Sequence, residues 1–171
     1  LSSIKMDLYR RDFTINALAV HLNSNDYGEL EDFFGAQRDI KEHTIRVLHS
    51  LSFVEDPTRI LRAIRFEQRF GFHIAAKAER LIKNALQLKL FDKLSGSRIA
   101  HELWLICEEA SPLACFKRLE GFGVLKAVHP LLQVKDDKEL LFVEMEKMNA
   151  WYDLLYLEPK PRHWLTCLLC F

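Results

Sequence analysis

The pattern of hydrophobic and polar positions divides this chain into two parts that meet near residue 50. Before that point, residues 18–22 place large apolar side chains at every second position, which is typical of a strand. Turn-forming residues over 23–28 separate it from a second strand-like run over 29–33, and the pair predicts a β-hairpin. The first part is therefore expected to contain strands.

Short helices are expected beside these strands. Asp12 can cap a short helix that runs through about Ala17, because a carboxylate accepts hydrogen bonds from the first free N–H groups of a helix. Gly35 breaks the second strand of the hairpin. We expect a short helix over 36–42 and a strand rich in β-branched residues over 44–48.

From Ser50 onward the apolar positions recur at helical spacing. In the stretch from Pro57, for example, Ile60, Leu61 and Ile64 fall on one side of a helix. Glycine and proline mark the ends of the repeats, namely Gly71, Gly96, Gly121, Gly123, Pro130, Pro159 and Pro161. The expected helices cover residues 50–55, 57–70, 75–88, 97–110, 112–121, 137–157 and 161–171. These elements together predict an α+β protein that is mostly α-helical.

Composition adds bounds to this picture. A chain of 171 residues with 49% hydrophobic and 28% charged residues is long and apolar enough to bury a core. The net charge is zero, so any nucleic-acid contact must rest on local clusters of cations. There is no signal peptide and no apolar run that could span a bilayer, so we expect a cytoplasmic protein without membrane contact. Both ends look cut, and we expect a piece of a longer protein.

The cysteines and histidines predict no metal or disulfide site. The pair Cys167 and Cys170 forms a lone CxxC inside an apolar run, without a second pair at zinc spacing, which favours core packing. The histidines are scattered along the chain, and no phosphate-binding GxxxxGK loop exists.

A charged ridge on the helix after Pro57 is the strongest chemical signal. Glu55 and Asp56 before the proline are typical of a helix start. From there, one acid and three arginines step every third position, and at ~1.5 Å rise per residue they span about 13 Å, roughly the length of an extended nucleoside triphosphate. The ridge consists of Asp56, Arg59, Arg62 and Arg65.

The first two residues of the ridge can distinguish nucleobases. A carboxylate only accepts hydrogen bonds and a guanidinium only donates them, so Asp56 and Arg59 together complement an edge with one donor and one acceptor. Adenine and cytosine offer such an edge, whereas guanine and uracil place a carbonyl and an N–H there. Arg62 and Arg65 could hold phosphates by charge-assisted contacts. The alternative is that the ridge is a solvated helix face whose acids pair with nearby arginines. On the helix expected over 97–110, the i,i+4 spacing of Arg98 and Glu102 predicts a local salt bridge with a structural role.

Four motifs in chain order carry a resemblance to a known family. They are RRDFTINALA at 10–19; Asp32, Gly35 and Asp39 continuing to Ile45 and Arg46; EDPTRILRAIRF at 55–66; and LSGSRIAHEL at 94–103. In that order they resemble the RRD motif, the head–neck hinge, the nucleotide-templating EDxxR motif and the motif that steadies the templating helix. The family is the class II, or bacterial-type, tRNA nucleotidyltransferases and poly(A) polymerases, which add CCA or its parts to tRNA 3′ ends.

The resemblance implies an organisation and a set of partners. Residues 1–49 would be a remnant of the nucleotidyltransferase head domain, residues 50–110 a helical neck that templates the nucleotide, and residues 111–171 a truncated helical body. The partners would be ATP or CTP and the tRNA 3′ end. LSGSRIAHEL resembles the tRNA type more than the poly(A) type, and the choice among C-adding, A-adding, CCA-adding and poly(A) activity stays open.

The resemblance also implies roles for single residues. Asp56 and Arg59 would pair with the incoming base, and Arg62 and Arg65 would support the base-reading helix and the bound nucleotide. Arg11 would contact the nucleotide and Asp12 the ribose 2′-hydroxyl. Arg98 and Glu102 would be structural.

The family's catalytic elements are missing from this stretch. A carboxylate pair that holds two Mg²⁺ ions and a GGxxRD loop would lie upstream of RRDFT. Asp136 and Asp137 are adjacent, so their side chains project in different directions from a helix or turn, and they are poor substitutes for the carboxylate pair that holds Mg²⁺. We therefore expect no catalytic residue and no metal ligand in this chain, and no activity of the piece alone. A non-catalytic helical RNA-binding or regulatory module is the alternative function.

Overall fold

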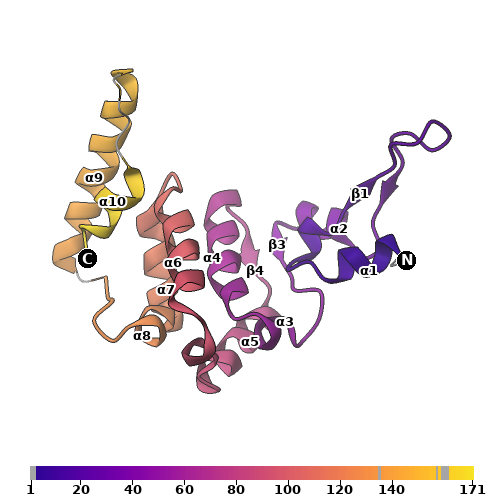
Figure 1. The fold of residues 1–171 in the computed structure, drawn as a ribbon, viewed down its shortest axis with the longest axis horizontal. Helices are drawn as coiled ribbons and strands as arrows, with labels where there is room; N and C mark the ends of the chain where they lie inside the picture. Colours follow the sequence, from indigo (N-terminus) through magenta and orange to yellow (C-terminus); the bar gives the residue numbers. More distant parts are fainter. Residues whose placement is uncertain (1–2, 135, 157, 159–161) are drawn as a thin grey trace.

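The computed structural model describes residues 3–134, 136–156, 158 and 162–171, without the side chains of Asp136 and Asp137. Its elements follow one another along an extended, curved molecule, with the N-terminal part at one end and α9 and α10 at the other (Figure 1). In the first part lie α1 (Ile4–Tyr9), η1 (Thr14–Asn16, a 3-10 helix), β1 (Ala19–Val20), β2 (Leu30–Glu31), α2 (Ala36–Lys41) and β3 (Thr44–Ile45). The rest comprises α3 (Ser52–Glu55), α4 (Thr58–Phe70), β4 (His73–Ile74), α5 (Ala76–Gln87), η2 (Leu90–Lys93), α6 (Gly96–Cys107), α7 (Pro112–Phe122), α8 (Val124–Val128), α9 (Asp136–Leu154) and α10 (His163–Leu168).

The predicted hairpin is confirmed, although its strands are short. β1 and β2 pair antiparallel, with Ala19 opposite Glu31 and Val20 opposite Leu30. The helix α1, in contrast, was not expected from the sequence. Its N-terminus is capped by Ser3, whose side chain accepts a hydrogen bond from the backbone N–H of Met6.

The spacing of Asp32, Gly35 and Asp39 has a direct structural reason. The Asp32 carboxylate accepts hydrogen bonds from the backbone N–H groups of Ala36 and Gln37, at 2.8 and 3.0 Å, and so caps α2. Gly35 stands between them with a φ of 77°, a left-handed conformation that glycine adopts without strain. One turn later, Asp39 points into the interior and is fully buried.

Asp39 joins three segments of the first part. Its carboxylate accepts a hydrogen bond from the Thr14 hydroxyl at 2.7 Å and one from Arg46 Nε at 2.9 Å. Thr14 belongs to η1 and Arg46 follows β3, so the buried charge fixes both against α2. A buried carboxylate is tolerated because it is paired and hydrogen-bonded.

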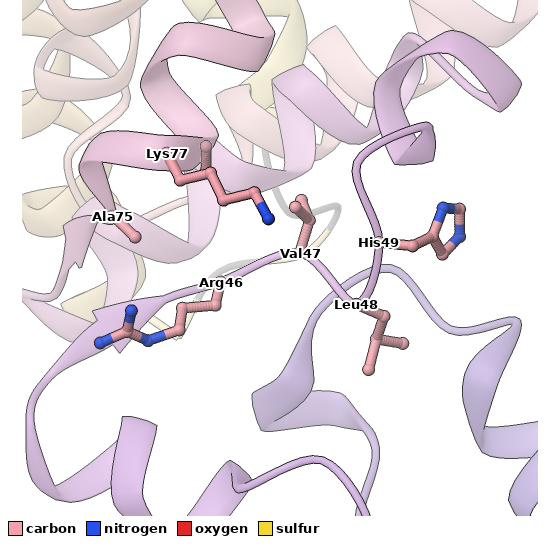
Figure 2. Close-up of a pocket in the computed structure, with 7 residues that line it drawn as sticks. Arg46, Val47, Leu48, His49, Ala75 and Lys77 are labelled. Atoms are coloured by element: carbon pink, nitrogen blue, oxygen red, sulfur yellow. The ribbon is translucent and has the colours of Figure 1, made fainter.

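The two parts of the chain are joined by a parallel pair of strands. Thr44 of β3 lies opposite His73 of β4, and Ile45 lies opposite Ile74. Periodicity did not indicate β4, since two residues are too few to show a period. Beyond β3, residues 46–49 pass the N-terminal end of α5, and together they line a hollow of about 240 Å³ (Figure 2).

The helical second part follows the prediction closely and adds, besides β4, the helices η2 and α8. α4 begins at Thr58, one residue later than expected, because Pro57 takes the N-cap position. Gly71 ends the helix with a φ of 63°, as its position predicted. The stop signals Pro159 and Pro161 lie outside the described residues. Among the described helices, none is both long and apolar enough to cross a bilayer.

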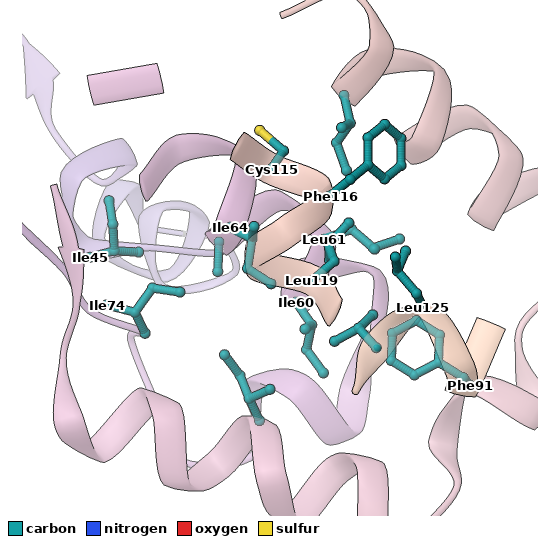
Figure 3. Packing of buried hydrophobic residues seen from close by; sticks show 14 of the residues in the cluster. Ile45, Ile60, Leu61, Ile64, Ile74, Phe91, Cys115, Phe116, Leu119 and Leu125 are labelled. Atoms are coloured by element: carbon teal, nitrogen blue, oxygen red, sulfur yellow. The ribbon is translucent and has the colours of Figure 1, made fainter. Parts of the chain in front are cut away.

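The hydrophobic core is built around α4. Ile60, Leu61, Ala63 and Ile64 have no exposed surface, and side chains from β4, α5, α7 and α8 pack around them (Figure 3). The cysteines are all free and buried, which confirms the packing interpretation for them: Cys107, Cys115, Cys167 and Cys170. Burial raises the pKa of the Cys115 thiol to about 12, so it stays protonated and behaves as a small apolar side chain.

A buried carboxylate on α4 fixes the neighbouring helices. Glu67 accepts hydrogen bonds from Arg118 Nε and Nη2 at 2.7 and 3.0 Å and from the backbone N–H of Ile74 at 3.0 Å. Arg118 also reaches Glu79 at 2.7 Å. Since these residues come from α4, β4, α7 and α5, the network holds α4 in a fixed orientation in the array.

Candidate functional site

A polar depression of about 570 Å³ lies where the first part of the chain meets the start of α4. Most of the residues that the ridge and RRD motifs predicted line it. The lining residues are Arg10, Arg11, Asp12, Asn16, Asp56, Arg59 and Arg62. Two segments at least 40 positions apart in the sequence therefore supply one surface.

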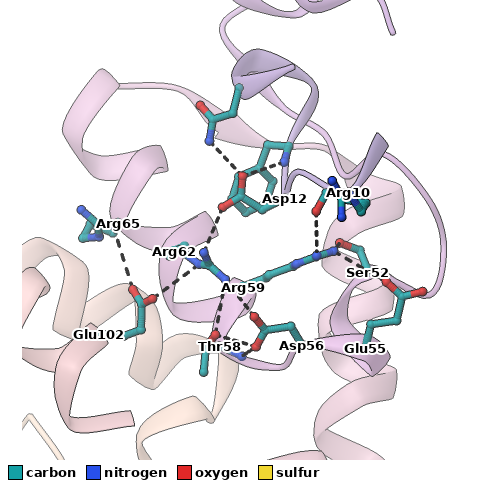
Figure 4. A network of polar contacts seen from close by, with 12 residues as sticks. Arg10, Asp12, Ser52, Glu55, Asp56, Thr58, Arg59, Arg62, Arg65 and Glu102 are labelled. Carbon is teal, nitrogen blue, oxygen red and sulfur yellow. Dashed lines mark hydrogen bonds and ion pairs between the residues drawn. The ribbon is translucent and has the colours of Figure 1, made fainter. Parts of the chain in front are cut away.

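Asp56 is held firmly at the edge of this depression (Figure 4). Its Oδ1 atom accepts hydrogen bonds from the Thr58 backbone N–H at 3.0 Å and the Thr58 hydroxyl at 2.6 Å, and Arg98 Nη2 lies 2.8 Å away. Its Oδ2 atom accepts one from Arg62 Nη2 at 3.0 Å. Burial opposes the charge, but the Thr58 hydrogen bonds and the two arginines outweigh it, so the pKa of Asp56 is lowered. The group is therefore an ionised acceptor at neutral pH.

Arg59 is equally well positioned. Its Nη1 donates to the Ser52 hydroxyl at 2.7 Å, and its Nη2 donates to the backbone carbonyl of Arg10 at 3.2 Å (Figure 4). Its side chain is 12% exposed. A guanidinium carries five N–H donors. The described contacts take two of them, which leaves donors for a ligand in the depression.

Arg62 lies at the centre of the polar network. Its guanidinium contacts three carboxylates: Asp12 at 3.4 Å, Asp56 at 3.0 Å and Glu102 at 3.5 Å. Glu102 comes from α6 and is buried. Burial raises the pKa of Glu102, and the charges of Arg62 and Arg65 only partly offset this effect. Arg62 thereby links the RRD segment, the start of α4 and α6.

Asp12 and Arg11 form the opposite side of the depression. Asp12 Oδ1 accepts hydrogen bonds from the Phe13 backbone N–H at 3.1 Å and from Asn16 Nδ2 at 3.0 Å, and its Oδ2 faces Arg62. Arg11 is 55% exposed, and its nearest acid is Asp7 at 3.6 Å. Arg11 is thus much more accessible to a ligand than Asp12, whose side chain is 12% exposed.

Arg65 does not line the depression. Its side chain is 9% exposed and lies between Glu102 of α6, at 4.0 Å, and Glu109, at 3.4 Å. The expected continuous ridge thus ends at Arg62, because each step of three residues turns back about 60° around a helix of 3.6 residues per turn. Arg65 supports the packing of α4 against α6.

The expected salt bridge between Arg98 and Glu102 is wrong. Among the ion pairs of the described residues, Arg98 bonds to Asp56 and Glu102 faces Arg62 and Arg65. Both residues of α6 therefore contact the start or the middle of α4 instead of each other. These contacts run between helices, which i,i+4 spacing cannot show, and the structural role of the two residues stays a prediction.

Sequence reasoning missed four groups of the site. Ser52 and the Arg10 carbonyl hold Arg59, Thr58 holds Asp56, and Asn16 holds Asp12. Thr58 had a local signal, because a hydroxyl two residues after an acid at a helix start can bond to it. Ser52 and the Arg10 carbonyl had none, since only the folded chain brings them to Arg59.

The carboxylates of the depression do not fit a magnesium ion. Asp12 and Asp56 both face the Arg62 guanidinium, which occupies the place of a cation between them. In the part of the chain that the structure describes, no group of three or more His, Cys, Asp or Glu side chains could hold a metal. The side chains of Asp136 and Asp137, the poor substitutes, lie outside the described residues.

Comparison with known proteins gives consistent matches. Residues 1–46 match the family described as the poly A polymerase head domain. Over 168 residues the chain is 53% identical to the A-adding tRNA nucleotidyltransferase of Geobacter sulfurreducens, in an alignment that covers 98% of this chain and 19% of that protein. The chain thus spans about a fifth of the length of this relative.

Solved structures match as well. A CCA-adding enzyme in complex with ATP is 46% identical, with a TM-score of 0.83 over 95% of this chain and 39% of that one. The Thermotoga maritima CCA-adding enzyme complexed with tRNA is 47% identical, with a TM-score of 0.80 over 92% and 38% of the respective chains. The mostly helical fold, with its few short strands, is that of the CCA-adding enzymes. The chain belongs to the tRNA nucleotidyltransferase and poly(A) polymerase family.

Proposed function

We propose that this chain is the nucleotide-selecting part of a template-independent RNA nucleotidyltransferase that adds C, A or both to tRNA 3′ ends. The observation that carries the proposal is the convergence of Asp56, Arg59, Arg62, Arg11 and Asp12 on one polar depression. The relatives whose names include A-adding and CCA-adding activity, and the solved complexes with ATP and with tRNA, support it.

Base selection rests on the hydrogen-bonding capacity that Asp56 and Arg59 have left. Asp56 stays ionised and so can only accept, and its Oδ2 atom, which among the described residues accepts from Arg62 alone, has a lone pair left. Arg59 keeps donors beyond those that bind Ser52 and the Arg10 carbonyl. An exocyclic amino group would donate to Asp56 and an unprotonated ring nitrogen would accept from Arg59. ATP and CTP provide both groups, whereas GTP and UTP would leave polar atoms unpaired, which is costly.

Ribose and phosphate recognition is assigned to the other side of the depression. Asp12 would accept a hydrogen bond from the ribose 2′-hydroxyl and Arg11 would contact the nucleotide. Arg62 would keep Asp12 and Asp56 at their present separation, because it contacts both. Arg65, Arg98 and Glu102 would act by fixing α4.

We propose that the metal-binding and catalytic residues lie elsewhere in the full-length protein. Because the carboxylates present do not fit magnesium, we propose that Mg²⁺ binds to residues elsewhere in the full-length protein. The division into head (1–49), neck (50–110) and body (111–171) and a cytoplasmic location stay predictions. The chain alone is expected to show no incorporation with tRNA, ATP and Mg²⁺, and incorporation would refute this expectation.

The test of base selection uses the full-length protein with Asp56→Ala or Arg59→Ala. We expect the preference for A and C over G and U to fall at least tenfold, or about 1.4 kcal/mol in discrimination. The measurement is the ratio of kcat/KM for ATP and CTP to that for GTP and UTP. An unchanged ratio in both variants would show that these side chains do not read the base.

A further inference from the structure

The solvent-exposed face of α5 is a cationic surface that the nucleotide site does not use. The helix buries its other face through Ala78, Ile82 and Ala85. The exposed residues of the helix are Ala76, Lys77, Arg80, Lys83, Asn84 and Gln87. The face therefore presents three cations and two amides and no acid.

The three cations have no counter-charge in the part of the chain that the structure describes. Lys77, Arg80 and Lys83 take part in none of its ion pairs, whereas every arginine of α4 lies within 4.0 Å of a carboxylate. The one acid of α5, Glu79, is turned towards Arg118 at 2.7 Å. In a protein of zero net charge, α5 is thus a local positive patch.

The patch continues beyond the C-terminal end of α5. Lys77 lies near the other end of the helix, at the rim of the hollow beside residues 46–49 (Figure 2), and two more exposed lysines, Lys89 and Lys93, follow the helix, with one exposed acid, Asp92, between them. From Lys77 to Lys83 the cations span about 9 Å at ~1.5 Å per residue. A nucleic-acid duplex carries one negative charge per ~1.7 Å of its axis, so several phosphates fall within this span.

We propose that the α5 face binds the phosphodiester backbone of RNA, without reading its sequence. This proposal rests on the proposed function, because it names a surface by which the enzyme would hold its RNA substrate. Backbone contacts are made by Arg, Lys, Asn and Gln side chains, which are the residue types present here. A protein partner is disfavoured because interface cores are rich in aromatic and other large apolar side chains. The exposed residues of α5 include none of these, and Leu88 at its C-cap is the one large apolar side chain exposed beside them in the described part of the helix and its caps.

The test compares two charge-matched double variants, Arg80→Gln/Lys83→Gln on α5 and Lys41→Gln/Lys126→Gln elsewhere. Lys41 and Lys126 are also exposed and without an ion pair in the described part of the chain. Binding of a fluorescently labelled RNA hairpin is measured by fluorescence anisotropy at several NaCl concentrations. The measurement is made on the 171-residue chain and on the full-length protein. Circular dichroism establishes that each variant is folded.

We expect the α5 variant to bind the hairpin at least ~10-fold more weakly at 100 mM salt. The slope of log K against log salt should fall by about 0.7 to 0.9 for each lost contact. The Lys41/Lys126 variant should keep the wild-type slope. Equal losses in both variants, or no loss in either, would overturn the proposal, as would poly-glutamate competing as well as unlabelled RNA of equal charge.

Titration with ATP separates this proposal from the proposed function. The α5 variant should bind ATP as the wild type does, because the substituted residues do not line the depression. If wild-type protein binds RNA through α5 but neither ATP nor CTP, the nucleotide-selecting function fails and the RNA surface stands. If it binds ATP and CTP while α5 proves irrelevant to RNA, only the RNA surface fails.

Discussion

The hydroxyl of Ser52 accepts a hydrogen bond from Arg59 Nη1 at 2.7 Å. Ser52 has no exposed surface and belongs to α3, whereas Arg59 lies on the first turn of α4. With the Arg10 carbonyl on its other amino group, the guanidinium is held from two sides. Its direction is therefore set before any ligand binds, which lowers the entropy lost when it pairs with a base.

The first prediction concerns Ser52 as a positioning residue. In the full-length protein, Ser52→Ala should lower the kcat/KM preference for ATP and CTP over GTP and UTP by roughly three- to tenfold, because Arg59 loses one of its two anchors. The expected cost in stability is about 1–2 kcal/mol for a lost buried hydrogen bond. Ser24→Ala in the exposed turn is the control and should change neither quantity. Unaltered selectivity in folded Ser52→Ala protein would contradict the positioning role.

The second prediction concerns the Arg118–Glu67 pair. Arg118→Ala leaves the buried Glu67 carboxylate without its cation, so the free energy of unfolding should fall by roughly 3 kcal/mol. Urea denaturation measures it. Lys147→Ala removes the exposed pair with Glu144, whose side chains are 66% and 58% exposed, and should cost less than about 1 kcal/mol. Similar losses in the two variants would show that burial of Glu67 does not matter.

The third prediction concerns pH and Asp56. Its pKa is lowered in the folded state, since the Thr58 hydrogen bonds and the two arginines outweigh its burial. The ionised group therefore stabilises the fold above the unfolded pKa of about 3.9, and this contribution is lost as pH falls through the folded pKa. The stability gap between wild type and Asp56→Asn, about 1–2 kcal/mol at neutral pH, should narrow below pH 4. Urea titrations from pH 7 downwards test this, and a gap that widens in acid would contradict it.

The fourth prediction compares two glycines. Gly35→Ala should destabilise the protein by about 1–2 kcal/mol, because φ is 77° there and a Cβ atom would lie 3.3 Å from Arg38 Nη2. Gly121→Ala, on the exposed side of α7 with open space at the Cβ position, should be neutral or stabilise by up to about 1 kcal/mol. Thermal melts of both variants give the comparison. A destabilised Gly121→Ala protein would show that α7 does not tolerate alanine there.

Local patterns were enough for the elements around the site. The hairpin and the helices from α3 to α7 follow from periods of two and 3.6 residues and from the glycines and prolines at their ends, which act within a few positions. The helix cap expected from Asp12 is wrong, because η1 begins after Phe13 and has no side-chain cap hydrogen bond. Of the two strands that join the parts of the chain, β3 was predicted and β4 was not, because a strand of two residues shows no period.

What the sequence by itself determined is the set of side chains: an acid, an arginine and a second arginine at the start of one helix, and an RRD segment upstream. Only the tertiary structure decided their directions and partners. The rotation of the helix directs Arg65 away from the depression, towards Glu102 and Glu109. The packing of α6 against α4 brings Arg98 into an ion pair with Asp56. The physical reason is that ion pairs and hydrogen bonds depend on distances of a few ångströms between segments, and spacing along the chain fixes such distances only within one element.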